Sequence, residues 1–364
     1  MSLLRELLIK TVSLGASDLH LKVNQPAMFR LHSELINSGT EVLTPDILTE
    51  LVEDIIPPHA RSHYEQRHEV DFSLDEVEVG RFRVNIFLTH GIPAVAMRHV
   101  KTRIPTFKEL HLPDILNKIA LFPRGIVIAS GTTGSGKSTT LASMIQHINN
   151  MVARRIITIE DPIEYVFTDI KSVISQREVG LDTVSFHSAL KHILRQDPDV
   201  IMVGEMRDAE SFSAGLAASE TGHLVFSTVH TDTASQTIPR ILNFFPSNER
   251  EQVRLSLATN IRAVICQRLV PAAHGEGVFP AVEIMINNST VRKLIEKNQL
   301  EKLAAAIETG VEDGMQTFNQ AVYDLIRTGK ITEEEGMSRA NNPETLKMNL
   351  KGIFLDEARR ILDS

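Results

Sequence analysis

Apolar and polar residues follow two periodicities along the first hundred residues, one helical and one of period two. From Leu3 to Leu14 the apolar positions recur at helical spacing, which predicts an amphipathic helix. Thr44 followed by Pro45 is typical of a helix start, and a further helix is expected to end near Arg67. An alternation of period two predicts half-buried strands at 18–23, 28–31, 70–74, 81–88 and 94–100. Residues 1–100 are therefore expected to form a small α+β domain.

A second pattern begins after residues 101–113, which contain two prolines and little periodicity and which we interpret as a linker. Beyond it, continuous apolar runs alternate with helical patterns. Such runs are typical of parallel strands buried on both faces, and they lie at 126–129, 156–159, 200–203 and 224–228. Helices are predicted at 137–149, 186–195, 209–218 and 234–242. The pattern predicts an α/β sheet with helices on both faces.

From Glu249 onward the pattern becomes mostly helical. A short pair of strands is predicted near 266–270 and 278–285. Helices are expected after it, near 290–296, 300–308, 316–327 and 332–340. Residues 114–364 are thus expected to form one α/β domain that continues into a helical C-terminal region.

A glycine-rich turn joins the first strand of this domain to its helix. Gly131, Gly136, Lys137 and Ser138 fill the pattern G-x-x-x-x-G-K-[ST]. Glycines let the backbone turn so that its N–H groups point into one concave space, at the positive end of the following helix. Lys137 can reach the outer phosphates of a nucleotide, and the Ser138 hydroxyl can bind Mg²⁺. We therefore predict that ATP and Mg²⁺ bind at Gly131, Thr132, Thr133, Gly134, Ser135, Gly136, Lys137, Ser138 and Thr139.

Three predicted strands of this domain end in polar residues: Glu160, Glu205 and His230. The carboxyl ends of parallel strands meet at one edge of a sheet, so these residues should converge on the phosphate loop. Hydrolysis of a γ-phosphate needs a positioned water, a metal and neutralised charge. Glu160 or Glu205 can orient the water while the other holds the Mg²⁺ shell, and His230 can hydrogen-bond the γ-phosphate. The sequence alone does not tell which of the two carboxylates orients the water and which one holds the Mg²⁺ shell.

An arginine that would neutralise transition-state charge is not obvious within this domain, because Arg207 begins a predicted helix. Period two places Arg81 and Arg83 of the small domain on one face of a strand, and Arg98 lies on another strand. If subunits form a ring, a neighbour's small domain could lay these arginines over the phosphates, where an arginine in trans accelerates the reaction about 10³–10⁵-fold. The alternative is an ordinary solvated sheet face.

Composition narrows the class of protein. The chain has 38 Lys and Arg against 46 Asp and Glu, a net charge of −8 that does not favour nucleic acid as the main partner. Cys266 is the only cysteine, which excludes internal disulfides and suggests a small buried residue. Charged residues interrupt the N-terminal apolar positions, and no window approaches eighteen uncharged apolar residues. We expect a cytoplasmic protein without direct membrane insertion.

Together these motifs resemble the secretion-type ring ATPases of type IV pili, and most closely their PilT-like retraction branch. The resemblance covers nearly the whole chain. The Walker A motif of that family resembles residues 131–138, its acidic box residues 158–164, its Walker B motif residues 199–208, and its histidine box residues 220–230. The helix typical of the retraction branch is approximated by residues 290–297.

The resemblance implies a PAS-like N-terminal domain, a RecA-like ATPase domain and a homo-hexamer. It suggests Glu160 as the base that activates water and Glu205 as the Walker B residue. It also implies that the strand bearing Arg81 and Arg83 supplies arginines across the subunit boundary. Assembly-type relatives usually carry an extra N-terminal domain and a four-cysteine zinc insertion, so a chain that begins at the small domain and has one cysteine favours the retraction branch.

The expected function is thus a hexameric ATP-hydrolysing motor that powers pilus retraction, and with it twitching motility, by nucleotide-driven domain rotation. Its expected partners are an inner-membrane platform protein and a paralogous ATPase. One alternative is an accessory, PilU-like retraction paralogue. Others are a nucleic-acid translocase, which needs a basic strand channel, and a nucleotide-gated binding protein that does not hydrolyse ATP.

Overall fold

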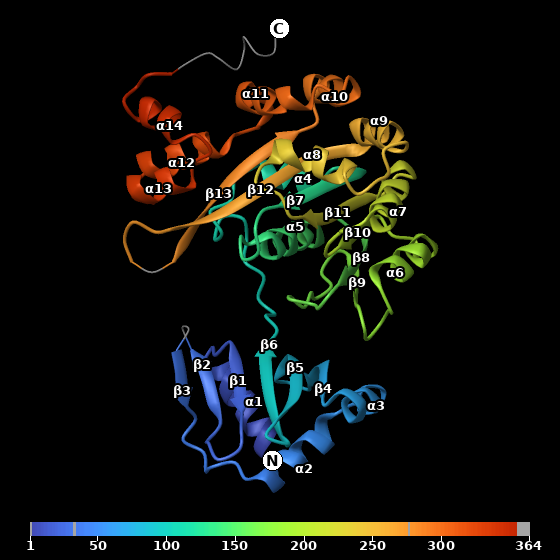
Figure 1. Cartoon of the computed structure of the whole chain (residues 1–364), viewed down its shortest axis with the longest axis vertical. Coiled ribbons are helices and arrows are strands. Elements are labelled where there is room, and N and C mark those ends of the chain that lie inside the picture. Colours follow the sequence, from blue (N-terminus) through green and yellow to red (C-terminus); the bar gives the residue numbers. More distant parts are fainter. Residues whose placement is uncertain (1, 32–33, 276, 355–364) are drawn as a thin grey trace. The chain divides into compact units, whose positions relative to one another are not determined.

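The computed structural model describes residues 2–31, 34–275 and 277–354. The chain divides into two compact units (Figure 1). Unit 1 comprises residues 1–103 and 164–166, and unit 2 comprises residues 104–163 and 167–364. The boundary falls inside the segment interpreted as a linker. Residues 104–113 belong to unit 2, where the Phe107 and Leu112 side chains are buried.

Unit 1 is built on an antiparallel sheet whose strands are ordered β3-β2-β1-β6-β5-β4 in the described residues. These strands are β1 (Asp18–Leu21), β2 (Met28–Leu31), β3 (Glu34–Asn37), β4 (Glu69–Glu76), β5 (Gly80–Thr89) and β6 (Ile92–His99). Its helices are α1 (Leu3–Ser13), α2 (Pro45–Ile55) and α3 (Pro58–Arg67). Leu8 of α1 and Leu48 of α2 are buried in one cluster with Phe82 and Val84 of β5. The predicted α+β domain is therefore present, with its inward and outward strand faces as expected.

The strand β3 was not predicted from the sequence. All four of its residues are exposed, so no buried position repeats along it. It forms because its backbone pairs with β2 at the edge of the sheet, with Arg30 opposite Leu35. Pairing of this kind depends on a partner strand rather than on a local apolar pattern.

Unit 2 contains a sheet ordered β13-β12-β7-β11-β10-β8-β9 in its described residues. The neighbours from β12 to β9 pair in parallel, and β13 is antiparallel to β12. These strands are β7 (Gly125–Ser130), β8 (Arg155–Glu160), β9 (Val173–Glu178), β10 (Val200–Val203), β11 (Leu224–Val229), β12 (Ile261–Pro271) and β13 (Val278–Ile286). The last two were predicted as a short pair. They are longer than expected, and β12 extends the main sheet beside β7.

The helices of unit 2 cover both faces of this sheet, as the sequence predicts. One layer contains α4 (Ile115–Ala120) and α5 (Lys137–Met151), whose apolar residues are buried with Val127 of β7. The other layer contains α6 (Phe186–Ile193), α7 (Ala209–Glu220), α8 (Ala234–Leu242) and α9 (Arg250–Asn260), buried against Ile128 of β7. Neither α4 nor the edge strand β9 was predicted, because both are short and only partly apolar.

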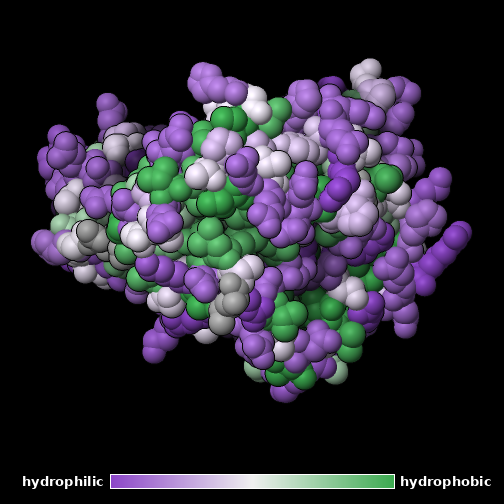
Figure 2. All heavy atoms as spheres, turned by 90° about the horizontal axis from the view of Figure 1, so that it is seen from below, coloured by the Kyte–Doolittle hydropathy of each residue, from purple (hydrophilic) through white to green (hydrophobic). Residues whose placement is uncertain are grey.

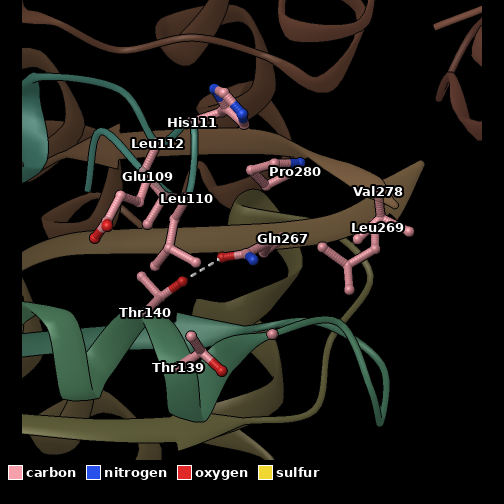
Figure 3. Close-up of a pocket in the computed structure, with 11 residues that line it drawn as sticks. Glu109, Leu110, His111, Leu112, Thr139, Thr140, Gln267, Leu269, Val278 and Pro280 are labelled. Carbon is pink, nitrogen blue, oxygen red and sulfur yellow. Dashed lines mark hydrogen bonds between the residues drawn. The ribbon is translucent and has the colours of Figure 1, made fainter. Parts of the chain in front are cut away.

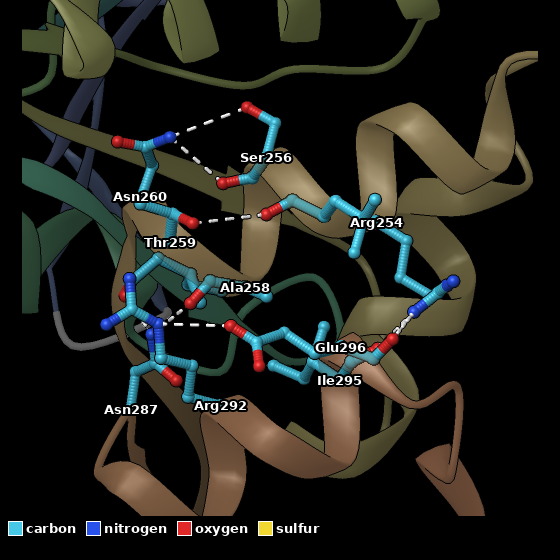
Figure 4. A network of polar contacts seen from close by, with 11 residues as sticks. Arg254, Ser256, Ala258, Thr259, Asn260, Asn287, Arg292, Ile295 and Glu296 are labelled. Atoms are coloured by element: carbon cyan, nitrogen blue, oxygen red, sulfur yellow. Dashed lines mark hydrogen bonds and ion pairs between the residues drawn. The ribbon is translucent and has the colours of Figure 1, made fainter.

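The chain then continues through helices that pack on the β12–β13 end of the sheet (Figure 1). They are α10 (Ser289–Glu296), α11 (Leu303–Thr309), α12 (Phe318–Arg327), α13 (Glu333–Arg339) and α14 (Pro343–Leu350), with the 3-10 turns η2 (Leu300–Lys302) and η3 (Val311–Asp313) between them. A third 3-10 turn, η1 (Leu194–Gln196), directly follows α6. Polar contacts fix α10 to α9 (Figure 4). The Asn287 amide donates to the Ala258 and Ile261 carbonyls at 2.9 and 2.8 Å, and the Arg254 guanidinium donates to the Ile295 carbonyl at 2.7 Å.

The surface mixes polar and apolar residues. On the face drawn in Figure 2, hydrophobic residues gather in patches among hydrophilic ones. Among the residues that the structure describes, no helix is both long and apolar enough to cross a membrane.

Candidate functional site

The turn between β7 and α5 has a backbone that glycine alone accommodates. Gly131 has a φ of 137°, and Gly136, the N-cap of α5, has a φ of 90°. A Cβ at Gly131 would lie 2.5 Å from the Gln267 carbonyl oxygen, and one at Gly136 would lie 2.6 Å from the Gln267 Nε2 atom. The Lys137 Nζ atom donates to the Gly131 and Thr132 carbonyls, both at 2.9 Å. The turn thus presents backbone N–H groups and a buried cation at a helix N-terminus, which suits a phosphate chain.

Sheet order decides how far each polar strand end lies from this turn. The strand β11, which leads to His230, is the neighbour of β7, and β10, which leads to Glu205, comes next. Glu160 closes β8, one strand farther. Adjacent strands are about 4.8 Å apart, so Glu205 follows a strand two spacings from β7 and Glu160 a strand three spacings away.

Glu205 and His230 lie close together. The Glu205 Oε2 atom is 3.9 Å from the His230 Nε2 atom, and its Oε1 atom is 2.5 Å from the Arg207 Nη2 atom. Burial and the positive charge of Lys137 lower the pKa of His230, which the Glu205 carboxylate only partly opposes. The imidazole is therefore neutral near pH 7, with one N–H to donate.

Glu160 is held more rigidly. Its carboxylate is buried, with 7% of the residue exposed, and its Oε1 atom accepts from Thr158 Oγ1 at 2.6 Å and from Gln176 Nε2 at 3.1 Å. Gln176 lies on β9, the strand that the sequence analysis missed. A carboxylate oriented by two donors at the edge of a phosphate site can position a water molecule.

The donors fit a nucleotide-bound magnesium ion better than a protein-only metal centre. Among the described residues, no cluster of three or more His, Cys, Asp or Glu side chains could hold a metal by itself. Magnesium in nucleotide sites is usually held by one or two protein oxygens together with phosphates and waters. Ser138 in the first turn of α5 and Glu205 supply oxygens of that kind.

A cavity of about 180 Å³ adjoins the phosphate turn (Figure 3). Apolar side chains form much of its wall, among them Leu110, Leu112 and Leu269. The Thr140 hydroxyl donates to the Gln267 Oε1 atom at 2.8 Å across one side. An apolar cleft with a few polar groups, beside a glycine-rich turn, can accept a flat group such as the base of a nucleotide. The sequence analysis missed Gln267, because only the pairing of β12 with β7 brings it beneath the turn.

The three arginines predicted to act in trans lie in unit 1 on the outer face of its sheet. Arg83 and Arg98 are directly opposite each other across β5 and β6, and Asp18 is opposite Arg98 across β1 and β6. The Arg98 Nε atom is 2.8 Å from the Asp18 Oδ1 atom. The Arg83 Nη2 atom is 4.0 Å from the Asp71 Oδ1 atom, and the Arg81 Nη1 atom is 3.7 Å from the Asp75 Oδ2 atom. The strand pairing therefore gathers all three on one face of unit 1.

Cys266 is buried on β12, as expected. Burial raises the pKa of its thiol to about 11, so the thiol is protonated near neutral pH and is no nucleophile.

Comparison with known proteins gives a consistent result. The family model for Type II/IV secretion system protein matches residues 1–337. The chain is 39% identical to the Pseudomonas aeruginosa protein "Type IV pilus ATPase PilU", over 95% of this chain and 91% of that one. It is 40% identical to "Type IV pilus retractation ATPase PilT" of the same organism, over 93% of this chain and 98% of that one. A crystal structure of the pilus retraction motor PilT with bound ADP superposes with a TM-score of 0.88 at 42% identity, covering 95% of this chain and 99% of that one.

Proposed function

The chain belongs to the Type II/IV secretion system protein family, and we propose that it is the ATP-hydrolysing motor of type IV pilus retraction. One observation carries the proposal: a phosphate-binding turn with Lys137 shares a sheet edge with Glu160, Glu205 and His230. That edge lies in a chain that matches PilT almost end to end. The fold is accordingly an α+β N-terminal unit followed by a RecA-like unit with C-terminal helices.

In this proposal the base of ATP enters the cavity beside Thr140 and Gln267, and the backbone N–H groups of residues 131–138 bind the phosphates. The Ser138 hydroxyl and the Glu205 carboxylate would hold Mg²⁺, which would supply positive charge against the phosphates. Glu160 orients the attacking water, supported by its rigid and buried carboxylate. His230 donates its N–H to the γ-phosphate, as a neutral imidazole can.

The remaining positive charge comes from a second copy of the chain. We propose that Arg81, Arg83 and Arg98 of a neighbour in a homo-hexamer contact the phosphates. They lie on the polar outer face of the unit 1 sheet, where the Arg83 and Arg98 side chains are 44% and 67% exposed and that of Arg81 is 16% exposed. ATP between subunits then binds unit 2 of one copy and unit 1 of the next. Hydrolysis releases that contact and allows the units to rotate about residues 101–103, which lead from unit 1 into unit 2, a hinge-type motion. The work would pass to pilin through an inner-membrane platform protein, on the cytoplasmic side.

The decisive experiment is steady-state ATP turnover on size-fractionated material, with the wild-type chain beside Glu160→Gln. We expect turnover in an oligomeric fraction, and a loss of about 10²–10⁴-fold in the variant with the elution position unchanged. Full turnover by a monomer at every concentration would contradict the motor. Full turnover by the Glu160→Gln variant would contradict the assigned base while leaving the motor intact.

A second candidate is an accessory retraction ATPase, because the chain is about as similar to PilU as to PilT. Deleting the gene separates the two: loss of all retraction indicates the principal motor, and a partial defect indicates an accessory, with a paralogous ATPase as its partner. A nucleic-acid translocase would instead show ATP turnover stimulated by single-stranded DNA, which we do not expect for an acidic chain.

A further inference from the structure

Side chains from the edge of the unit 2 sheet hold the backbone that directly follows His230. The Cys266 Sγ atom donates to the Thr231 carbonyl at 3.5 Å, and the Arg268 Nη2 atom donates to the Asp232 carbonyl at 2.9 Å. The Glu283 Oε1 atom accepts from the Ala234 N–H at 2.6 Å. Cys266 and Glu283 are cross-strand partners on β12 and β13, and Arg268 lies two residues along β12 on the same face.

Two of these side chains also hold the C-terminal helices. The Glu283 Oε2 atom accepts from the N–H of Phe318, the first residue of α12, at 3.4 Å. The Arg268 guanidinium lies 4.0 Å from the centre of the Phe318 ring, and its Nη1 atom donates to the Arg339 carbonyl at 2.5 Å, the last residue of α13. One carboxylate therefore serves the N-termini of both α8 and α12, each of which would otherwise have an unsatisfied N–H group.

Burial makes these contacts sensitive to small changes. Glu283 is 4% exposed, and this burial raises the pKa of its carboxyl, against the two backbone N–H groups and Arg268, which lower it. A buried carboxylate that loses one of its donors leaves a polar group unsatisfied. A displacement of α12 would therefore strain its contact with Glu283. Because Glu283 also holds Ala234, the displacement would reach the segment that sets the position of His230.

We propose that Arg268 and Glu283 are positioning residues for His230 that connect the phosphate site to helices α12 and α13. The proposal rests on the proposed function, in which His230 contacts the γ-phosphate. Neither residue touches the nucleotide. They act by fixing the backbone at Asp232 and Ala234, so that the imidazole N–H meets the phosphate only in one arrangement of the C-terminal helices.

The test uses two near-isosteric changes in the full chain, Glu283→Gln and Arg268→Lys. The first replaces one acceptor oxygen with an amide that cannot accept from a backbone N–H, and the second removes the two-pronged contact. We expect each to lower kcat for ATP about tenfold or more, with KM and ADP affinity changed less than about twofold, since only the γ-phosphate contact is displaced.

A matched control separates positioning from loss of stability. Asn288 caps α10 through the Thr290 and Val291 N–H groups and touches neither Arg268 nor Glu283 in the described contacts. Asn288→Ala should lower the melting temperature by a similar amount while leaving kcat within about twofold. If all three variants lose kcat in proportion to their loss of melting temperature, the positioning role is overturned. Should Glu283→Gln fail to fold, Arg268→Lys decides by itself.

The double variant His230→Ala with Glu283→Gln supplies a second criterion. If Glu283 acts through His230, the double variant should hydrolyse ATP no more slowly than His230→Ala alone. If the two single losses in kcat multiply in the double variant, the inference is overturned. Failure of the proposed function looks different. In that case His230→Ala itself retains full turnover, or the wild-type chain does not hydrolyse ATP.

Discussion

The phosphate site of unit 2 and the arginine face of unit 1 differ in how their charged groups are held. Lys137 and Glu160 are 9% and 7% exposed, with hydrogen bonds of 2.6–3.1 Å to loop carbonyls and neighbouring side chains. The side chains of Arg83 and Arg98 are 44% and 67% exposed. Only Arg98 has a short ion pair, because Arg83 is 4.0 Å from its carboxylate.

This difference in burial and hydrogen bonding fits different roles for the two regions. Groups that are buried and fully engaged are preorganised, which is what charge stabilisation at a reacting centre requires. Ion pairs of exposed arginines contribute little to stability, and such arginines can exchange their partners. In the proposed mechanism, arginines of unit 1 therefore supply positive charge to the phosphate site in unit 2 of another copy. The predictions that follow test this division.

Arg83→Ala should have the largest effect. Loss of an arginine that acts in trans is expected to reduce ATP turnover about 10³–10⁵-fold, while the melting temperature stays close to that of the wild type because the side chain is exposed. Steady-state turnover and thermal unfolding measure the two effects. Arg67→Ala, on the exposed end of α3, is the matched control and should retain full activity. Normal turnover of Arg83→Ala would reduce the arginine face to a solvated surface.

Lys137→Met tests the other side of the comparison. Removing a preorganised cation from the phosphate turn should lower turnover about 10²–10³-fold and weaken ATP binding as well. A fluorescent ATP analogue measures the affinity, and Lys191→Met on the exposed surface of α6 serves as control. Mixing Lys137→Met subunits with Arg83→Ala subunits should restore part of the turnover, because a mixed ring then contains sites with an intact lysine from one copy and an intact arginine from the next.

Gln267→Glu probes the packing beneath the turn. The Thr140 hydroxyl can still donate to a carboxylate oxygen, but the Nε2 atom beside Gly136 becomes a negatively charged oxygen near the phosphates. We expect KM for ATP to rise about tenfold with a smaller change in kcat. Gln146→Glu, on the solvent side of α5, is the matched control. An unchanged KM would show that Gln267 does not contribute to nucleotide binding.

The smallest effect concerns the pH dependence of stability in unit 1. Burial against Phe82 lowers the pKa of His99 in the folded state, so below about pH 6.5 the unfolded chain binds more protons and stability falls. His99→Gln removes this contribution. Its melting temperature should therefore fall about 1–2 °C less than that of the wild type between pH 7 and pH 5. The same change at exposed His63 should leave the wild-type slope, and an identical slope for His99→Gln would contradict the assignment.

Local patterns in the sequence were enough to predict the family, the ATPase activity and most of the helices and strands. The alternation at 81–88 predicted which side chains of β5 are buried, and the glycine spacing predicted the turn before α5, because both depend on backbone geometry within a few residues. The ends of β8, β10 and β11 were predicted to meet for the same reason, since parallel strands share their carboxyl edge.

Tertiary structure decided what depends on pairing between distant segments. The edge strands β3 and β9 have no strong local pattern and form because a neighbouring strand supplies their hydrogen bonds. Only the pairing of β12 with β7 places Gln267 under the phosphate turn, and only the packing of α8 and α12 on β13 brings two helix ends to Glu283. These contacts join residues 35 to 127 positions apart and leave no periodic trace in a single sequence, so the chain must fold before they can be recognised.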